Sequence, residues 1–310
     1  MRERRPVDNH LLRSVGPTPM PFAARIRRRA IACAALSTMM TAAHPATAGG
    51  RLLATGGITE IEGSAGGGIT PWALIAGLGT EDQIGGSASC TQVAPQDFRL
   101  DSCGFALGID NRLELSADRL RFDLGSTVPG QSIRLDVFGA KVRLFGDAVF
   151  DQDRWWPQVA LGVQWKHNED FGLVPKALGA SHADGADFYL AATKVWLDGP
   201  LDHTWLADVT LRASEANQLG LLGFGGNLGG YHLLTEGSLG MFVTDRMIVG
   251  AEYRQKPNNL SAFREDDFGD VFLSYFPVKY LAITAAFADL GNIANKPGQR
   301  GYYVSIQGSL

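Results

Sequence analysis

After Gly49 the sequence has no apolar stretch approaching the roughly 20 residues that a membrane-spanning helix requires. Cysteine is scarce too: the chain has three, of which only Cys90 and Cys103 follow Gly49. Two cysteines without a nearby histidine are a poor metal site, and no glycine motif of the kind that cradles phosphate is present. We therefore expect no metal and no cofactor.

The first 48 residues have the features of a cleaved export signal. Arg25 to Arg29 form a basic segment, Ala30 to Ala43 are mostly small and apolar, and Ala46-Thr47-Ala48 provides an A-x-A site before Gly49. We expect residues 1–48 to be a leader and residues 49–310 a single domain. Met20 is an alternative start. A cytosolic chain with a basic tail is the competing interpretation.

Removal of this leader makes the protein more acidic. The leader carries eight of the 28 basic residues and two of the 32 acidic ones, so residues 49–310 have a net charge of −10. Nucleic-acid binding requires clustered lysine and arginine to neutralise phosphates. No such cluster remains, and we expect no nucleic-acid partner.

The spacing of the connections predicts an outer-membrane β-barrel. Counting back from Leu310, long connections alternate with short ones, and the segments between them are about ten residues long, as in barrels with tight periplasmic turns and longer outer loops. We predict an all-β, antiparallel, up-and-down transmembrane barrel of fourteen strands, with twelve as the alternative if the weak first strand and one partner are absent. The predicted strands are residues 51–61, 69–79, 83–94, 98–109, 112–123, 132–145, 156–166, 186–197, 203–213, 231–243, 246–255, 268–276, 279–289 and 301–310.

Most of these segments alternate between apolar and polar residues, as expected of strands with one face in lipid and one in a wet lumen. In two segments the apolar residues move from one face of the strand to the other partway along. The change lies between Leu115 and Leu120 in residues 112–123, and between Val137 and Phe138 in residues 132–145. A bulge that inserts one residue would explain the change. A strand buried on both faces is the alternative.

The end of the chain favours membrane insertion. Tyr302, Val304, Ile306 and Leu310 share one face of the last segment, a pattern that the barrel-assembly machinery is thought to read. Aromatic residues near the strand ends are typical of interfacial girdles. We therefore expect the bacterial outer membrane as the location, with the lipid bilayer and the assembly machinery as partners. The oligomeric state is left open.

Cys90 and Cys103 are equally distant from the centre of a hairpin that turns at Gln96-Asp97. Directly opposed residues approach closely enough for a disulfide, and export to an oxidising compartment would let it form. The sequence therefore predicts a cross-strand disulfide.

Charged residues on the polar faces are candidates for lining a pore: Asp208, Arg212, Glu236, Glu252 and Arg254. The segment from Arg254 to Asp267 adds Arg264, Glu265 and Asp266, whose opposed charges would form a constriction at the barrel mouth. Residues 218–230 are unusually apolar for an outer loop. They could plug the barrel, but we favour the simpler account in which they extend the flanking strands, with glycines at bulges.

Catalysis is not expected. Ser181, His182 and Asp184, close in sequence to His167, Glu169 and Asp170, form the one cluster that resembles a hydrolase site. A nucleophile and its base need a fixed hydrogen bond and a third group that orients the base, which adjacent residues of a flexible loop rarely supply. A solvated polar loop is the preferred interpretation.

Several stretches resemble DUF3034, a family of bacterial outer-membrane proteins of unknown function. They are residues 52–57, 71–75, 217–226, 252–277, 284–293 and 299–302. The resemblance implies a β-barrel and assigns no substrate. We predict a passive pore for small solutes. The alternatives are a non-conducting structural or surface-interaction barrel and a transporter of hydrophobic compounds.

Overall fold

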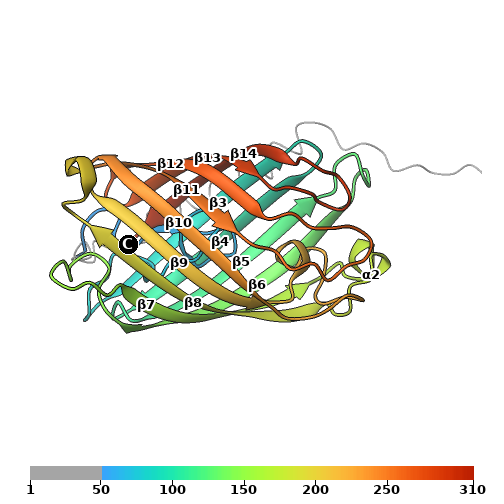
Figure 1. Cartoon of the computed structure of the whole chain (residues 1–310), viewed down its shortest axis with the longest axis horizontal. Coiled ribbons are helices and arrows are strands. Elements are labelled where there is room, and N and C mark those ends of the chain that lie inside the picture. The colour runs from blue at the N-terminus through green and yellow to red at the C-terminus, as the bar shows by residue number, and fades with distance from the viewer. Residues whose placement is uncertain (1–50) are drawn as a thin grey trace, which may run out of the picture. The chain divides into compact units, whose positions relative to one another are not determined.

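The computed structural model describes residues 51–310, so the predicted leader lies outside the described residues. Twelve strands, β3 to β14, form a closed barrel (Figure 1). Each strand is antiparallel to its neighbours, and β14 closes the barrel against β3. Among residues 51–310, no helix is long and apolar enough to cross a membrane. The elements are β1 (Ile58–Thr59), β2 (Ala65–Gly66), β3 (Ile84–Pro95), β4 (Arg99–Ile109), β5 (Leu113–Asp123), β6 (Ser132–Phe145), β7 (Gln158–Asn168), α2 (Val174–Ala177), β8 (Asp184–Trp196), η1 (Pro200–Asp202), β9 (Trp205–Ser214), η2 (Asn217–Gly220), β10 (His232–Thr244), β11 (Met247–Arg254), β12 (Phe268–Val278), β13 (Leu281–Asp289) and β14 (Arg300–Ser309).

The barrel has two unlike ends. Leu310 and the connections β10–β11 and β12–β13 lie at one end, here called the turn end. The connections β7–β8, β9–β10, β11–β12 and β13–β14 lie at the other, the loop end. The predicted alternation of short and long connections does not hold in the N-terminal half of the barrel. The β6–β7 connection at the turn end is long, whereas β3 and β4 are joined at the loop end by only Gln96, Asp97 and Phe98.

The predicted barrel is confirmed, but with twelve strands rather than fourteen. Residues 51–61 and 69–79 are not wall strands. Residues 55–79 are all buried, and we call them the plug. Their short pair, β1 and β2, forms a separate two-stranded sheet. The plug is rich in glycine, and Gly57, Gly63 and Gly77 have positive φ angles, which bend the backbone out of the extended conformation that a wall strand needs.

The plug lies inside the barrel because it contacts inward-facing side chains around the wall. Thr59 donates to Gln307 on β14, Ser64 donates to Glu114 on β5, and the Ala73 amide donates to Thr193 on β8. These contacts come from widely separated parts of the wall. The lumen is therefore filled by the chain itself.

The phase changes in β5 and β6 have a simpler cause than a bulge. The ladder between these strands runs without a shift from Leu113↔Val142 to Asp123↔Ser132, so the predicted bulge is wrong. At the loop end, Leu120 and Val137 face inward and are fully buried. Toward the turn end, Leu115 and Phe138 face outward and are exposed. The inner face of these two strands is therefore apolar near the loop end, and their outer face is apolar nearer the turn end.

The outer surface carries a band of exposed apolar side chains on every part of the wall. A water-soluble barrel would place polar residues there, whereas hydrocarbon favours this arrangement. Examples are Leu107, Leu115, Phe138, Leu161, Phe188, Val209, Leu239, Val271, Phe287 and Val304. The wall therefore suits a lipid environment outside and a polar one inside.

Candidate functional site

The predicted pore-lining residues on the strands all face the lumen. Asp208, Arg212, Glu236, Glu252 and Arg254 are at most 4% exposed. A water-filled pore would leave such side chains in contact with water. In this structure four of them contact the plug or one another instead, and the Asp208 carboxylate accepts hydrogen bonds from the Thr193 and Thr210 hydroxyls of the wall.

A network of ion pairs joins the plug to the middle of the wall. Glu62 of the plug pairs with Lys166 on β7, and its Oε2 lies 2.7 Å from Arg254 Nη2. On the wall, Arg254 Nε lies 3.3 Å from Glu236 Oε1. Arg212 pairs with the same Glu236 carboxylate. Arg212 Nη1 also lies 3.8 Å from Glu62 Oε2, so one plug carboxylate is shared by cations from three strands, β7, β9 and β11.

Glu252 forms a second attachment. Its Oε2 accepts hydrogen bonds from the backbone amides of Gly68 (2.6 Å) and Ile69 (2.9 Å), and its Oε1 accepts one from the Thr70 hydroxyl (2.8 Å). A Cβ atom on Gly67 would lie 1.7 Å from Glu252 Oε1. Glycine at position 67 therefore lets the carboxylate approach the plug backbone.

A third attachment lies between β5 and β6. Glu114 accepts hydrogen bonds from the amides of Ala65 (3.1 Å) and Ala76 (2.8 Å). Lys141 donates to the carbonyl oxygens of Ala65 (2.9 Å) and Trp72 (3.1 Å), and its Nζ lies 3.1 Å from Glu114 Oε1. The polar backbone of the plug is satisfied here by one buried ion pair of the wall.

Residues 216–225, here called the lid, are all buried at the loop end. The expectation that this segment extends β9 and β10 is wrong, because β9 ends at Ser214 and β10 begins at His232. Positive φ angles at Gln218, Leu219 and Gly220 curl the chain back. The Asn168 side chain on β7 then donates to the carbonyl oxygens of Gly220 and Leu221.

The predicted constriction segment folds over the same opening, but its charges do not stay together. Glu265 is buried, accepts a hydrogen bond from the Gln218 amide of the lid (3.3 Å) and lies 3.7 Å from Lys256 Nζ. Arg264 and Asp266 are exposed instead. Burial raises the pKa of Glu265 to about 7, against the opposing effect of Lys256. The hydrogen bond from the Gln218 amide to Glu265 therefore joins the lid to the β11–β12 loop, and Lys256 of the same loop lies beside that carboxylate.

The family of the chain follows from a comparison with family models. The model described as "Protein of unknown function (DUF3034)" matches residues 55–307, which include the plug and the whole wall. The chain belongs to the DUF3034 family. No curated protein matches it.

Solved structures resemble this DUF3034 protein in fold alone. A structure titled "KdgM porin" is 13% identical and covers 72% of this chain and 99% of its own, with a TM-score of 0.46. Omp33 of Acinetobacter baumannii is 8% identical, with 74% and 99% covered and a TM-score of 0.41. The COG4313 outer membrane channel of Pseudomonas putida F1 is 11% identical, with 77% and 96% covered and a TM-score of 0.37.

The remaining predicted residues lie outside this network. Cys90 and Cys103 are directly opposite on β3 and β4 and form a disulfide on the outer face. At the loop end, His182 forms backbone hydrogen bonds with Phe224 of the lid. His167 contacts Asp184 at 2.7 Å through Nδ1. In residues 51–310, no group of three or more His, Cys, Asp or Glu side chains could hold a metal.

Sequence reasoning missed the plug residues of this DUF3034 protein. The predicted strand of residues 51–61 includes Glu60 and ends before Glu62, and neither was expected in the lumen, although both are buried there. Eight glycines among residues 55–79 were the available signal, because a strand that spans a membrane rarely tolerates so many.

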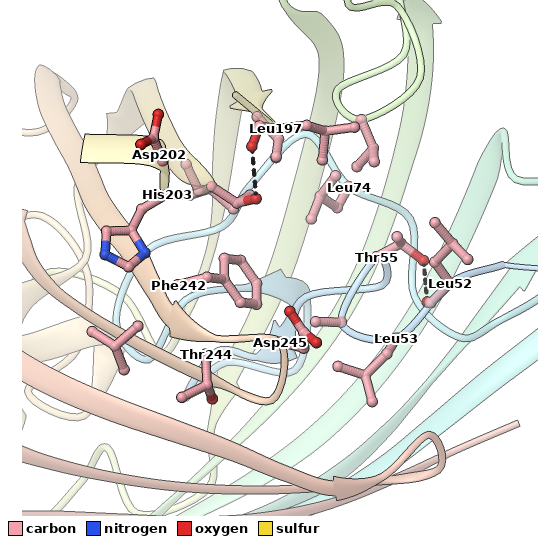
Figure 2. A pocket seen from close by; sticks show the side chains of 16 residues that line it. Leu52, Leu53, Thr55, Leu74, Leu197, Asp202, His203, Phe242, Thr244 and Asp245 are labelled. Atoms are coloured by element: carbon pink, nitrogen blue, oxygen red, sulfur yellow. Dashed lines mark hydrogen bonds between the residues drawn. The ribbon is translucent and has the colours of Figure 1, made fainter. Parts of the chain in front are cut away.

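The DUF3034 barrel also has a cavity of about 530 Å³ at its turn end, lined in part by Thr55 and Leu74 of the plug (Figure 2). Leu53, Leu74 and Phe242 project into it, and Asp202 and Asp245 lie at its edge. We call this cavity the vestibule.

Proposed function

We propose that this protein is an outer-membrane channel that its plug closes, and that it gives small solutes a passive path when the plug moves. The exposed apolar band supports a membrane location, and in single-chain bacterial barrels with an even number of strands the termini lie in the periplasm. The turn end would then face the periplasm and the lid the outside.

The observation that carries the proposal is the chemistry of the plug–wall contact. A permanently filled lumen is most stable when apolar side chains fill it, because buried ion pairs repay little of their desolvation cost. Here Glu62, Glu114 and Glu252 hold the plug through charges and hydrogen bonds. Water can replace such contacts when the plug leaves.

The open lumen would be mildly selective. With the plug displaced, the buried inward-facing side chains of the wall include seven acids and four bases, an excess that favours cations. Because both signs are present, we expect only a weak preference. The acids are Glu114, Asp118, Asp187, Asp208, Glu236, Glu252 and Asp270, and the bases are Lys141, Lys166, Arg212 and Arg254.

A disulfide between plug and wall provides the test. Thr70 Oγ1 of the plug lies 2.6 Å from Ser238 Oγ on β10, so the double variant T70C/S238C places two thiols in contact. The control is T91C/S305C, which joins β3 to β14 at a directly opposed pair and leaves the plug free.

Conductance in a planar bilayer distinguishes the outcomes. We expect channel openings in the unmodified protein and in the T91C/S305C control. In oxidised T70C/S238C the openings should disappear, and reductant should restore them. If the oxidised T70C/S238C variant conducts like the control, the plug is not the gate. If the folded unmodified protein never conducts, the barrel is structural.

A second candidate is transport of hydrophobic compounds. The contact between plug and lid is apolar, since Ile61, Ile69 and Leu219 line a small cavity of about 30 Å³. The lid itself presents buried Leu221, Leu222 and Phe224. An apolar route from the lid to the vestibule would favour this function. It predicts that an apolar solute crosses protein-containing vesicles faster than it crosses protein-free vesicles.

A further inference from the structure

The vestibule is a ligand-sized cavity with an uneven distribution of charge. Its volume of about 530 Å³ lies within the range of small-molecule sites. Leu53 and Leu74 come from the N-terminal segment, whereas Val195, Leu206 and Phe242 come from the ends of β8, β9 and β10. These side chains give the cavity an apolar interior.

Two carboxylates mark its edge. Asp202 lies in η1, between β8 and β9, and Asp245 lies in the turn between β10 and β11. Figure 2 shows them on different sides of Phe242. Both are exposed, and the lining includes His203 but neither lysine nor arginine. The nearby cation Arg246 donates to the Pro277 carbonyl oxygen instead.

We propose that the vestibule binds a small amphiphile with a protonated amine, its apolar part against Phe242 and its amine attracted by the exposed carboxylates Asp202 and Asp245 on either side of that ring. An apolar interior favours the hydrocarbon portion, and two acidic side chains without a basic neighbour in the lining favour a cation. An anionic amphiphile of the same shape would be repelled. The assignment goes beyond the proposed gate, because this cavity is open at the turn end while the plug is in place.

Three probes with one carbon skeleton test the charge preference: phenylbutylamine, phenylbutanol and phenylbutyrate. Binding is measured by saturation-transfer NMR on the full-length mature protein in amphipol, with protein-free amphipol as the blank. We expect the amine to bind about fivefold more tightly than the alcohol, in line with the modest strength of exposed ion pairs, and the carboxylate to bind least. Equal binding of the three probes would overturn the proposal.

Variants locate the site. D202N/D245N should remove the advantage of the amine over the alcohol and leave alcohol binding unchanged. The matched control is D198N, which removes an exposed acid from the same β8–β9 connection but outside the lining. F242A should weaken all three probes together.

Two results would contradict the assignment. One is a preference for the amine that survives D202N/D245N, or that D198N removes equally well. The other is amine binding that appears only in a variant that begins at Arg51, since another part of the chain would then take the cavity. Neither result depends on whether the plug gates conductance, so failure of the binding site and failure of the gate are distinguishable.

Discussion

The Glu62 carboxylate lies 2.7 Å from the Arg254 guanidinium, and this contact joins the plug to β11 inside a closed wall. Both side chains are almost fully buried, and Glu62 also pairs with Lys166. Removing the carboxylate would leave Lys166 with Asp187 and Arg254 with Glu236, so that this buried group would lose one of its negative charges.

We therefore expect E62Q to destabilise the protein by about 3 kcal/mol, because Lys166, Arg212 and Arg254 would then share fewer buried carboxylates and their charge would be only partly compensated. Urea unfolding in detergent, followed by tryptophan fluorescence, measures the loss. The control is D101N, which breaks the exposed pair between Arg99 and Asp101 and should cost less than about 1 kcal/mol. Similar losses in the two variants would contradict a role of Glu62 in holding the plug.

Gly67 provides a steric test of the Glu252 attachment. In G67A the new methyl group would meet Glu252 Oε1 at 1.7 Å, and the carboxylate could move away only by giving up its hydrogen bonds to Thr70 and Ser238. We expect more frequent channel openings and a lower melting temperature. G172A is the matched control, since a Cβ there meets no atom within 4 Å. A G67A variant that behaves like G172A would show that this attachment does not hold the plug.

The contact between the lid and the β11–β12 loop should depend on pH. Burial raises the pKa of Glu265 to about 7, so the closed state binds a proton more tightly than an opened, solvated state with a pKa near 4.5. By linkage, closure is then most favourable below about pH 4.5 and weakens as pH rises to about 7.

Hydrogen exchange of amides in residues 216–225, corrected for the intrinsic rate, measures this effect. We expect stronger protection at pH 5.5 than at pH 7.5. E265Q cannot titrate and should show equal protection at both values. An unchanged pH difference in E265Q would mean that another group controls the lid.

The Cys90–Cys103 disulfide should affect stability and leave conduction intact, because both residues lie on the outer face of β3 and β4 and away from the plug. It closes a short loop, with a sequence separation of 13, and we expect C90S/C103S to lose about 3 kcal/mol at most. The urea midpoint tests this value. Altered single-channel conductance in this variant would contradict the separation of the two roles.

The sequence predicted the wall well because the alternation of side chains reports two different environments. From β7 onward, the inward positions Asp208, Arg212 and Glu252 and the outward positions Leu211 and Val271 follow the expected pattern. The pattern fails in β5 and β6 because the inward-facing side chains at the loop end, such as Leu120 and Val137, are apolar instead of polar.

The plug and lid could not be predicted in the same way. Alternation describes neighbours along one strand, whereas the partners of Glu62 and Glu252 are more than 100 residues away in sequence. The lid depends on left-handed conformations at Gln218 and Leu219, two non-glycine residues that give no local signal for them. Predicting such contacts requires knowledge of which segment fills the lumen.

The last residue of the chain joins three parts of the molecule. The Leu310 carbonyl oxygen accepts hydrogen bonds from the amide of Leu78, where the plug ends, and from the amide of Gly86 on the first wall strand. The Leu310 amide donates back to Gly86. One residue therefore holds both the closing contact of the wall and the end of the plug. Any displacement of the plug that breaks the contact at Leu78 would be felt at the junction between β14 and β3, whereas a displacement of residues 55–76 alone would leave that junction intact.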